Sequence, residues 1–228
     1  MSFGDIFYKT LIDGGSYLTI LKGLWATIKI SLLSVMIGTA LGTLVCVARM
    51  YRNRLVQGVA AVYIAVLRGS PVLLLLMLLY YVVFARSDLS APLIAVVAFS
   101  LNVSAHVAEC FRSAYSATDK MQAEAARTLG LSKWQAFRLI SLPQAAKIAK
   151  PTYQSILVNL IQWTSVVGYV TITDLTRVIN NIGSRTMQPL FMILVGMLLY
   201  LAIAYLCYGT FALTEIVSRK RAERRHSQ

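Results

Sequence analysis

The stretch DKMQAEAARTLGLSKWQAFRLISLPQAAKIAK, residues 119–150, interrupts a chain that is otherwise strongly apolar. Its charges recur too often for it to sit in lipid, where each would be costly to bury. It is long enough to form helices of its own, although a short turn would have sufficed to join two membrane spans. We therefore expect this segment to meet a partner rather than only to connect its neighbours.

The composition around this stretch indicates an integral membrane protein. Hydrophobic residues make up 57% of the 228 positions, charged residues only 14%, and the mean hydropathy is +0.66. A soluble globule of this size would need more polar surface. Cys46, Cys110 and Cys207 lie far apart in apolar sequence, without the spacing of metal ligands, so they predict buried side chains rather than a metal site or disulfide framework.

Five apolar segments are long enough to cross a bilayer, which needs about 20 mostly apolar residues each. We predict one all-α membrane domain over residues 1–228, a helical bundle with spans at about 21–47, 55–84, 89–111, 156–172 and 189–217. The second segment contains Arg68-Gly69-Ser70-Pro71 near its middle. Because proline removes a backbone donor, this segment is either one bent helix or two half-spans, and the first is favoured.

The distribution of basic residues predicts the orientation. The net charge of +13 would suggest nucleic acid in a soluble domain, but here the cations stand at the ends of apolar runs. Fifteen Lys and Arg follow the first, third and fifth spans, against five on the opposite side. Since cytoplasmic loops carry the excess, the amino terminus is predicted outside, and the carboxyl terminus and residues 119–150 inside. No nucleic acid is expected as a partner.

The cytoplasmic stretch predicts a helical hairpin. Gln122–Leu129 consists of strong helix formers, and Gly130 is suited to end that helix. Ser132 followed by Gln135 predicts a capping box at the start of a second helix. That helix is expected to be short, interrupted by Pro143 and ended before Pro151. On chemistry alone, the hairpin could lie on the membrane surface with its aromatics in the interface and its cations on anionic lipid.

The hairpin also carries a longer pattern: Glu124-Ala125-Ala126, three residues, Gly130, nine residues, Ile140, one residue, then Leu142-Pro143. It resembles the EAA loop of permease subunits of binding-protein-dependent ABC importers of type I. The resemblance implies that this loop couples to a cytoplasmic ATPase. The residues that it assigns to coupling are Glu124, Ala125, Ala126, Gly130, Leu131 and Pro143. Glu124 itself either pairs with a basic residue of the ATPase or caps its own helix.

Other segments are similar to the polar amino acid branch of that family. Leu67–Leu73 with Tyr80-Tyr81 resembles its arginine-glycine-threonine-proline segment, although Ser70 replaces the usual threonine. The branch commonly has lysine-aspartate-threonine-serine in the fourth span, where this chain has Gln162-Trp163-Thr164-Ser165. The resemblance implies transport of a polar amino acid or a relative such as an opine, and the neutral pair puts the usual acidic contact in question.

The chain has no Walker A pattern, so ATP and its Mg²⁺ must bind another chain. We therefore expect a non-catalytic subunit without a cofactor or metal of its own. The resemblance implies an ATPase dimer, a second permease of the same or a similar kind, and an external solute-binding protein. The expected location is the cytoplasmic (inner) membrane of a bacterium, crossed several times.

Polar residues inside spans are candidates for the substrate pathway, because each is costly to keep in lipid. They are Arg68, Asn102, His106, Glu109, Gln162 and Thr164. Asn102, His106 and Glu109 share one helix face, which lines either a water path or a structural network. Arg68 either holds a substrate carboxylate or pairs with Glu109.

Two other classes of function compete with the permease subunit. A stand-alone secondary transporter or channel is the stronger one, but such proteins usually carry an internal repeat and none is visible. A membrane-embedded enzyme is the weaker one, because no paired carboxylates or His/Cys cluster occurs at membrane depth.

Overall fold

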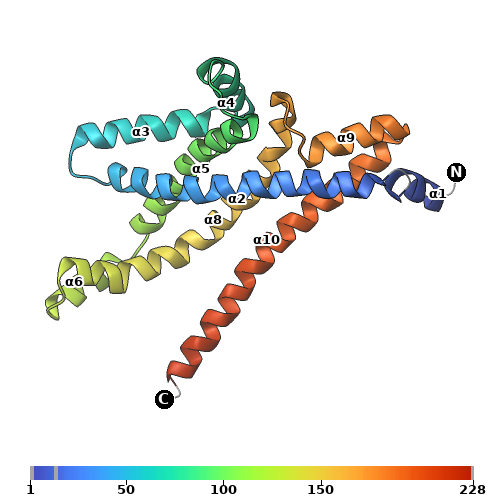
Figure 1. Ribbon diagram of the computed structural model, residues 1–228. Helices are drawn as coiled ribbons and strands as arrows, with labels where there is room; N and C mark the ends of the chain where they lie inside the picture. The colour runs from blue at the N-terminus through green and yellow to red at the C-terminus, as the bar shows by residue number, and fades with distance from the viewer. Residues whose placement is uncertain (1–2, 13–14, 227–228) are drawn as a thin grey trace. The chain divides into compact units, whose positions relative to one another are not determined.

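The computed structural model describes residues 3–12 and 15–226, without the side chains of residues 3, 5 and 213–226. Within these ranges every regular element is a helix, and there is no strand (Figure 1). In chain order the elements are α1 (Phe3–Phe7), η1 (Tyr8–Ile12), α2 (Ser16–Arg49), α3 (Arg54–Gly69), α4 (Val72–Leu78), η3 (Leu79–Val83), α5 (Ala91–Ser116), α6 (Lys120–Thr128), α7 (Lys133–Ala136), η4 (Phe137–Ser141), α8 (Leu142–Trp163), η5 (Thr164–Val170), α9 (Leu175–Thr186) and α10 (Pro189–His226).

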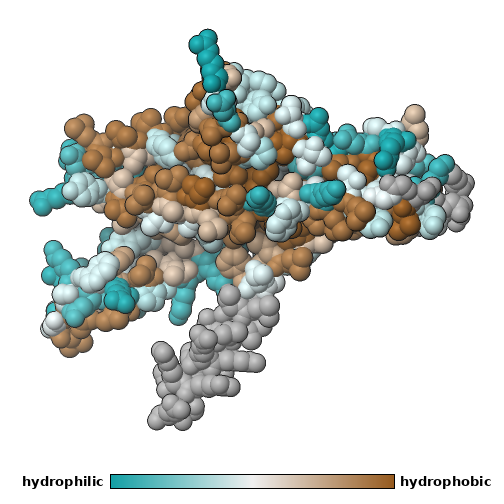
Figure 2. All heavy atoms as spheres, viewed as in Figure 1, coloured by the Kyte–Doolittle hydropathy of each residue, from teal (hydrophilic) through white to brown (hydrophobic). Residues whose placement is uncertain are grey.

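The helices fit a protein that crosses a membrane several times. Three of them, α2, α5 and residues 189–212 of α10, are long and apolar enough to span, and two bent pairs bring the possible number to five. Brown, hydrophobic side chains cover much of the surface in Figure 2, and many large apolar residues are exposed. The predicted all-α membrane architecture is confirmed. The side of each terminus stays a prediction, and the basic residues after position 218 lie outside the described side chains.

The second predicted span is two helices rather than one gently bent one. Helix α3 ends at Gly69, the chain extends at Ser70 (φ −89°, ψ 136°), and α4 with η3 continues at 105° to α3. Proline disfavours a helical conformation in the residue before it, which explains the extended Ser70. The Ser70 hydroxyl and amide both donate to the carbonyl of Val66. The break is therefore much sharper than an ordinary proline kink.

The helix leading into the fourth span corrects the predicted boundaries. Instead of ending before Pro151, it runs from Lys133 through η4 to Trp163, and Pro151 lies inside α8. In η4 the backbone makes wide turns, with the amide of Leu142 bonding to the carbonyl of Phe137. Such a π-turn relieves the clash that Pro143 would cause in a tighter turn. The hairpin of residues 119–141, called the coupling hairpin here after its predicted role, is thus joined to the membrane span without a loop.

Helix α9 lies between the last two predicted spans, where no helix was predicted. Its apolar residues recur at helical spacing, and Leu175, Val178, Ile179 and Ile182 are buried. They pack with Ile20 of α2 and Met192 of α10 in one hydrophobic cluster. The segment was missed because its mean composition is polar, while its one-sided pattern is typical of an amphipathic helix.

The chain contacts divide it into two compact units, residues 1–31 with 157–228, and residues 32–156. Helices α2 and α8 each pass through both units. The first unit contains the α9 cluster, and the second contains the coupling hairpin. The single domain proposed for residues 1–228 stays a prediction.

Helix α5 forms the centre of the second unit. Ala95, Phe99, Val103 and Val107 have no exposed surface. Gly38 and Gly42 of α2 lie directly against α5, so close that a β-carbon at either position would come within 2.7 Å of an α5 atom. Small residues at this spacing allow two helix backbones to approach closely in a membrane.

Candidate functional site

The first helix of the coupling hairpin begins at a side chain that the sequence reading did not identify. Asp119 is the N-cap of α6, and its carboxylate accepts a hydrogen bond of 2.9 Å from the amide of Met121. Glu124 lies in the second turn of the helix with its side chain exposed. The alternative in which Glu124 caps its own helix is therefore wrong, and its carboxylate remains available to other groups.

Gly130 ends α6 in the manner predicted. Its φ of +96° lies in the left-handed region that favours glycine. The amide of Leu131 bonds to the carbonyl of Ala126 at 3.2 Å, and the amide of Gly130 to that of Arg127 at 3.1 Å. This pair of bonds is the Schellman motif, which satisfies the last carbonyls of a helix while reversing the chain.

The second helix starts with the predicted capping box. The Ser132 hydroxyl accepts from the amide of Gln135 at 3.2 Å, and the Gln135 side chain accepts from the amide of Ser132 at 2.8 Å. Two backbone donors at the helix start are thus satisfied reciprocally. Gly130 and Ser132 together produce a tight connection between α6 and α7.

Gln144 ties the two arms of the hairpin together. Its side-chain oxygen accepts from the amide of Asp119 at 3.3 Å, and its side-chain nitrogen donates to Gln122 at 2.8 Å. Both contacts join the start of α8 to the start of α6. Nothing in a single sequence marks these glutamines as partners, because they lie more than twenty positions apart.

Replacing Gln144 with alanine is expected to loosen α6 without unfolding the protein. Each of the two lost hydrogen bonds is worth about 0.5 kcal/mol at this exposed site, so local opening should become about fivefold more frequent. Hydrogen–deuterium exchange of residues 120–128 measures the change. Lys147→Ala is the matched control, since Lys147 is exposed on the same helix. Equal exchange in both variants would contradict the tie.

The residues assigned to coupling lie in this hairpin, with Pro143 just after it, but differ in exposure. Glu124, Ala125, Gly130 and Pro143 are exposed, Leu131 is half-buried, and Ala126 is buried between the arms. Large apolar side chains are also exposed here, with Leu129 at 83% and Met121 at 77%. Exposed apolar side chains on a polar helix are typical of a surface that contacts another protein.

The candidate pathway residues of α5 form a mainly structural arrangement. Asn102 is 3% exposed and donates to the carbonyl of Leu67, at the end of α3, over 2.9 Å. Glu109 pairs with Arg112, one turn further along α5, with a shortest distance of 2.6 Å. The alternative pairing of Glu109 with Arg68 does not occur, and Arg68 is exposed. His106 is half-buried on the same helix.

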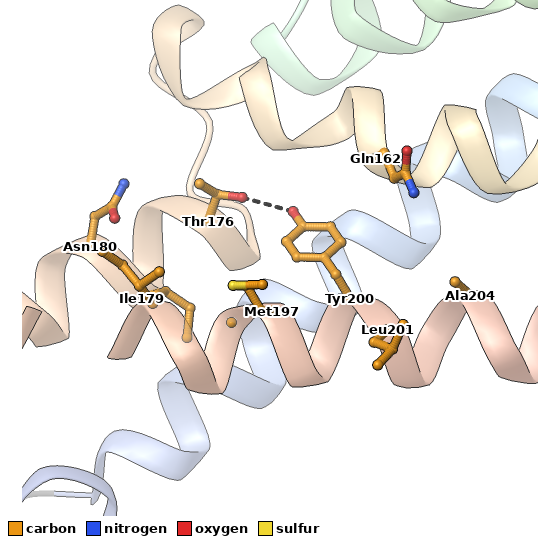
Figure 3. Close-up of a pocket in the computed structure, with 10 residues that line it drawn as sticks. Gln162, Thr176, Ile179, Asn180, Met197, Tyr200, Leu201 and Ala204 are labelled. Atoms are coloured by element: carbon orange, nitrogen blue, oxygen red, sulfur yellow. Dashed lines mark hydrogen bonds between the residues drawn. The ribbon is translucent and has the colours of Figure 1, made fainter. Parts of the chain in front are cut away.

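A pocket of about 360 Å³ lies in the other unit, between the end of α8, α9 and α10 (Figure 3). Its polar lining residues are Gln162, Thr176, Asn180 and Tyr200, and its apolar ones include Met197 and Leu201. Among its lining residues none is charged. Such a mostly apolar pocket with a few polar groups is typical of small-molecule sites. Thr176, Asn180 and Tyr200 were not among the predicted pathway residues.

The other predicted residue of this region, Thr164, is buried and does not line the pocket itself, although it contacts Tyr200, which does. Its hydroxyl donates to the carbonyl of Ile161 in its own helix at 2.6 Å. Of the six candidates, Gln162 and Thr164 belong to the first unit, and the other four belong to the second.

Asp174 organises the wall of this pocket. Its carboxylate is fully buried and accepts from the amides of Thr176 and Arg177, each at 3.0 Å. The hydroxyls of Thr176 and Tyr200 share a hydrogen bond of 2.8 Å, drawn in Figure 3. The amide of Leu175 donates to the hydroxyl of Thr27 at 3.2 Å. Helices α2, α9 and α10 thus meet at one polar network.

Metal chemistry has no support in the part of the chain that the structure describes. There, no group of three His, Cys, Asp or Glu side chains lies close enough to hold a metal ion. The geometry is that of a helical membrane protein with a polar helical hairpin in one unit and an uncharged pocket in the other.

Comparison with known proteins agrees with this geometry. Residues 27–222 match the family described as binding-protein-dependent transport system inner membrane component. A probable amino-acid ABC transporter permease protein, YckA of Bacillus subtilis, is 36% identical over 200 residues, covering 87% of this chain and 88% of the relative. The L-cystine transport system permease protein TcyB of the same organism is 30% identical, covering 89% and 86%.

A solved structure agrees as well. The crystal structure of an amino acid ABC transporter with histidines superposes with a TM-score of 0.81 at 28% identity, covering 94% of this chain and 98% of that one.

The chain belongs to the family of inner-membrane components of binding-protein-dependent transport systems. The resemblance seen in the EAA pattern is confirmed by this match. The relatives compared are permease subunits, which are not themselves enzymes. This protein is accordingly a multi-pass membrane permease of an ABC importer.

Proposed function

We propose that this chain forms the translocation pathway for a polar amino acid or a related small solute, and that its EAA loop couples the pathway to a cytoplasmic ATPase. The observation that carries the coupling is the hairpin itself. Its Schellman turn at Gly130 is closed by two backbone hydrogen bonds, its apolar residues Met121 and Leu129 are exposed, and it continues into α8 without a loop. A docked partner could therefore move the membrane helix directly.

The unbroken helix gives the proposal a mechanical basis. Transport against a gradient requires a source of free energy that distinguishes two states of the protein. The chain lacks a Walker A pattern, so that energy comes from ATP bound to another subunit. Movement of α7 would be transmitted through η4 to α8, because these three elements follow one another without a break.

The neutral pocket supports an amino acid as the cargo. It is lined by hydroxyl and amide groups that can bond to a polar solute, and Gln162 occupies one edge. The relatives named for amino acids or cystine cover most of this chain. Arg68, Asn102, His106, Glu109 and Thr164 are retained as proposed pathway residues, among which Arg68 is exposed and free of the predicted pairing with Glu109.

The proposed assembly contains two permeases, two ATPases and an external solute-binding protein. The protein would lie in the cytoplasmic membrane of a bacterium, with its amino terminus outside and its carboxyl terminus inside, as the basic residues predict. ATP and Mg²⁺ would be bound by the ATPase subunits alone. The coupling residues would be Glu124, Ala125, Ala126, Gly130, Leu131 and Pro143.

The test is the replacement of Gly130 with valine. A β-branched residue at φ +96° is strained by about 1–3 kcal/mol, and the strain is relieved only by reshaping the turn. We expect the variant to reach the membrane, to lose most of the co-purifying ATPase and to lose ATP-driven uptake. Co-purification in mild detergent and uptake into proteoliposomes are the measurements.

The matched control is Gly58→Val, since a side chain at Gly58 meets open space at an ordinary φ. ATPase recovery at the wild-type level in the Gly130 variant would place the interface elsewhere. Uptake by the purified wild-type chain without ATP would instead favour a secondary transporter.

A further inference from the structure

A second pocket, of about 310 Å³, lies between the end of α5 and the coupling hairpin. It is lined by Tyr115 and Thr118 after the membrane span, by the inner face of α6, and by α7 with η4. The charged side chains at its wall are Lys120, Glu124, Arg127 and Lys133. Neither the coupling role nor the translocation pathway accounts for this concentration of cations.

The charges of this pocket are unbalanced. Three cations face one carboxylate, and all four side chains are exposed at its rim. Within the described side chains, the ion pair between Arg112 and Glu109 is the one that forms, so Glu124 neutralises none of the three at ion-pair distance. A pocket with this surplus is suited to an anionic group, and Lys and Arg together provide point-charge and forked donors for phosphate.

The position of the pocket favours a lipid phosphate. It starts at Tyr115 and Thr118, directly where α5 leaves its membrane-spanning stretch. The rings of Tyr115 and Phe137 lie 5.9 Å apart, and those of Phe137 and Trp134 5.5 Å apart. Trp134 is 65% exposed. Aromatic rings next to cations at the end of a span are typical of the membrane interface, and basic pockets there bind lipid headgroups.

The pocket and the surface proposed for coupling share Glu124, but they lie mainly on different sides of α6. Lys120, Ala123 and Arg127 recur at helical spacing on the pocket side. Leu129 projects about half a turn away from that side and is exposed. One helix can therefore hold a headgroup on one side while a protein partner contacts the other.

We propose that this pocket binds the phosphate headgroup of an anionic phospholipid from the adjoining leaflet. The headgroup fills the positive site among Lys120, Arg127 and Lys133 and holds the hairpin against the membrane surface. The hairpin is then pre-ordered in membranes that contain anionic lipid and looser in those that lack it. This inference does not depend on the identity of the transported solute or on the ATPase.

The full chain is reconstituted in nanodiscs of phosphatidylcholine, alone or mixed with an equal amount of phosphatidylglycerol. Hydrogen–deuterium exchange of residues 120–141 should slow by about tenfold or more in the anionic nanodiscs. The triple variant Lys120→Gln/Arg127→Gln/Lys133→Gln should lose this protection. The control variant Arg138→Gln/Lys147→Gln changes two exposed cations that do not line the pocket. This control should keep the protection by anionic lipid.

Three outcomes would overturn the proposal. Equal protection by inorganic phosphate in phosphatidylcholine nanodiscs would identify a soluble anion, and protection that appears only when the purified ATPase is added would identify an acidic group of that partner. Loss of protection in both variants would show a general charge effect. If the triple variant is poorly folded by size exclusion, Lys120→Gln alone should still shift the lipid dependence to higher phosphatidylglycerol content.

Discussion

Replacing Gly42 with leucine is expected to destabilise the protein more than any other single change considered above. A β-carbon at this position would lie 2.7 Å from the carbonyl oxygen of Ser104 and 2.8 Å from the β-carbon of Val107. Both atoms belong to the fully buried part of α5, which has no room to retreat. Overpacking of this kind costs about 3 kcal/mol or more, and the thermal midpoint in detergent should fall by about 6–12 °C.

The neighbouring glycine, Gly38, allows the same experiment at a second position. A β-carbon at Gly38 would lie 2.7 Å from the side chain of Val103, so Gly38→Leu should behave similarly. Gly58→Leu is the control, because nothing lies within 4 Å of the added atom. Equal midpoints for the Gly42 and Gly58 variants would show that α2 and α5 are not packed as described.

Replacing Asp174 with leucine should detach the amino-terminal end of α9. The amides of Thr176 and Arg177 would lose their acceptor in a fully buried site. Loss of the cap and burial of unsatisfied donors together cost about 2–4 kcal/mol. We expect exchange of residues 175–186 to rise by about a hundredfold or more, and uptake to fall because Thr176 and Tyr200 line the pocket.

Two further variants locate the cause. Asp174→Asn keeps one acceptor oxygen, so its exchange of residues 175–186 and its uptake should lie between those of the wild type and the leucine variant. Asp88→Asn removes an exposed carboxylate from the loop before α5 and should change neither quantity. A leucine variant with wild-type exchange in α9 would mean that the buried network does not hold this helix.

Local signals in the sequence were sufficient to predict the elements that depend on hydrogen bonds between nearby residues. Gly130, Ser132 and Gln135 act through bonds to positions within five residues, so their roles could be read from spacing alone. The apolar runs were long enough to predict the spans. The break at Ser70 was visible as well, but its angle of 105° was not, because packing rather than the proline determines the direction of α4.

Features that depend on distant partners could not be predicted. Gln144 meets Asp119 and Gln122 through the fold of the hairpin, and Tyr200 meets Thr176 across two helices. Glu109 was free to pair with Arg68 or Arg112 in the sequence, and proximity along one helix decided for Arg112. Pro151 was expected to mark a boundary because helix interiors exclude proline. The helix continues through it, as the burial of the nearby Ala145 and Ala149 on α8 favours.

Because the helix is continuous from Lys133 to Trp163, a small tilt at one end would displace the other end by several ångströms. These 31 residues make a rod of about 46 Å at 1.5 Å per residue. A tilt of about 10° at the hairpin would swing the far end by about 8 Å if the rod stayed straight. Pro151 lies near its middle and, like Pro143 at the start of α8, has no amide hydrogen to bond to the preceding turn. The stiffness of the helix around Pro151 would then determine how much of a tilt at Lys133 reaches Trp163.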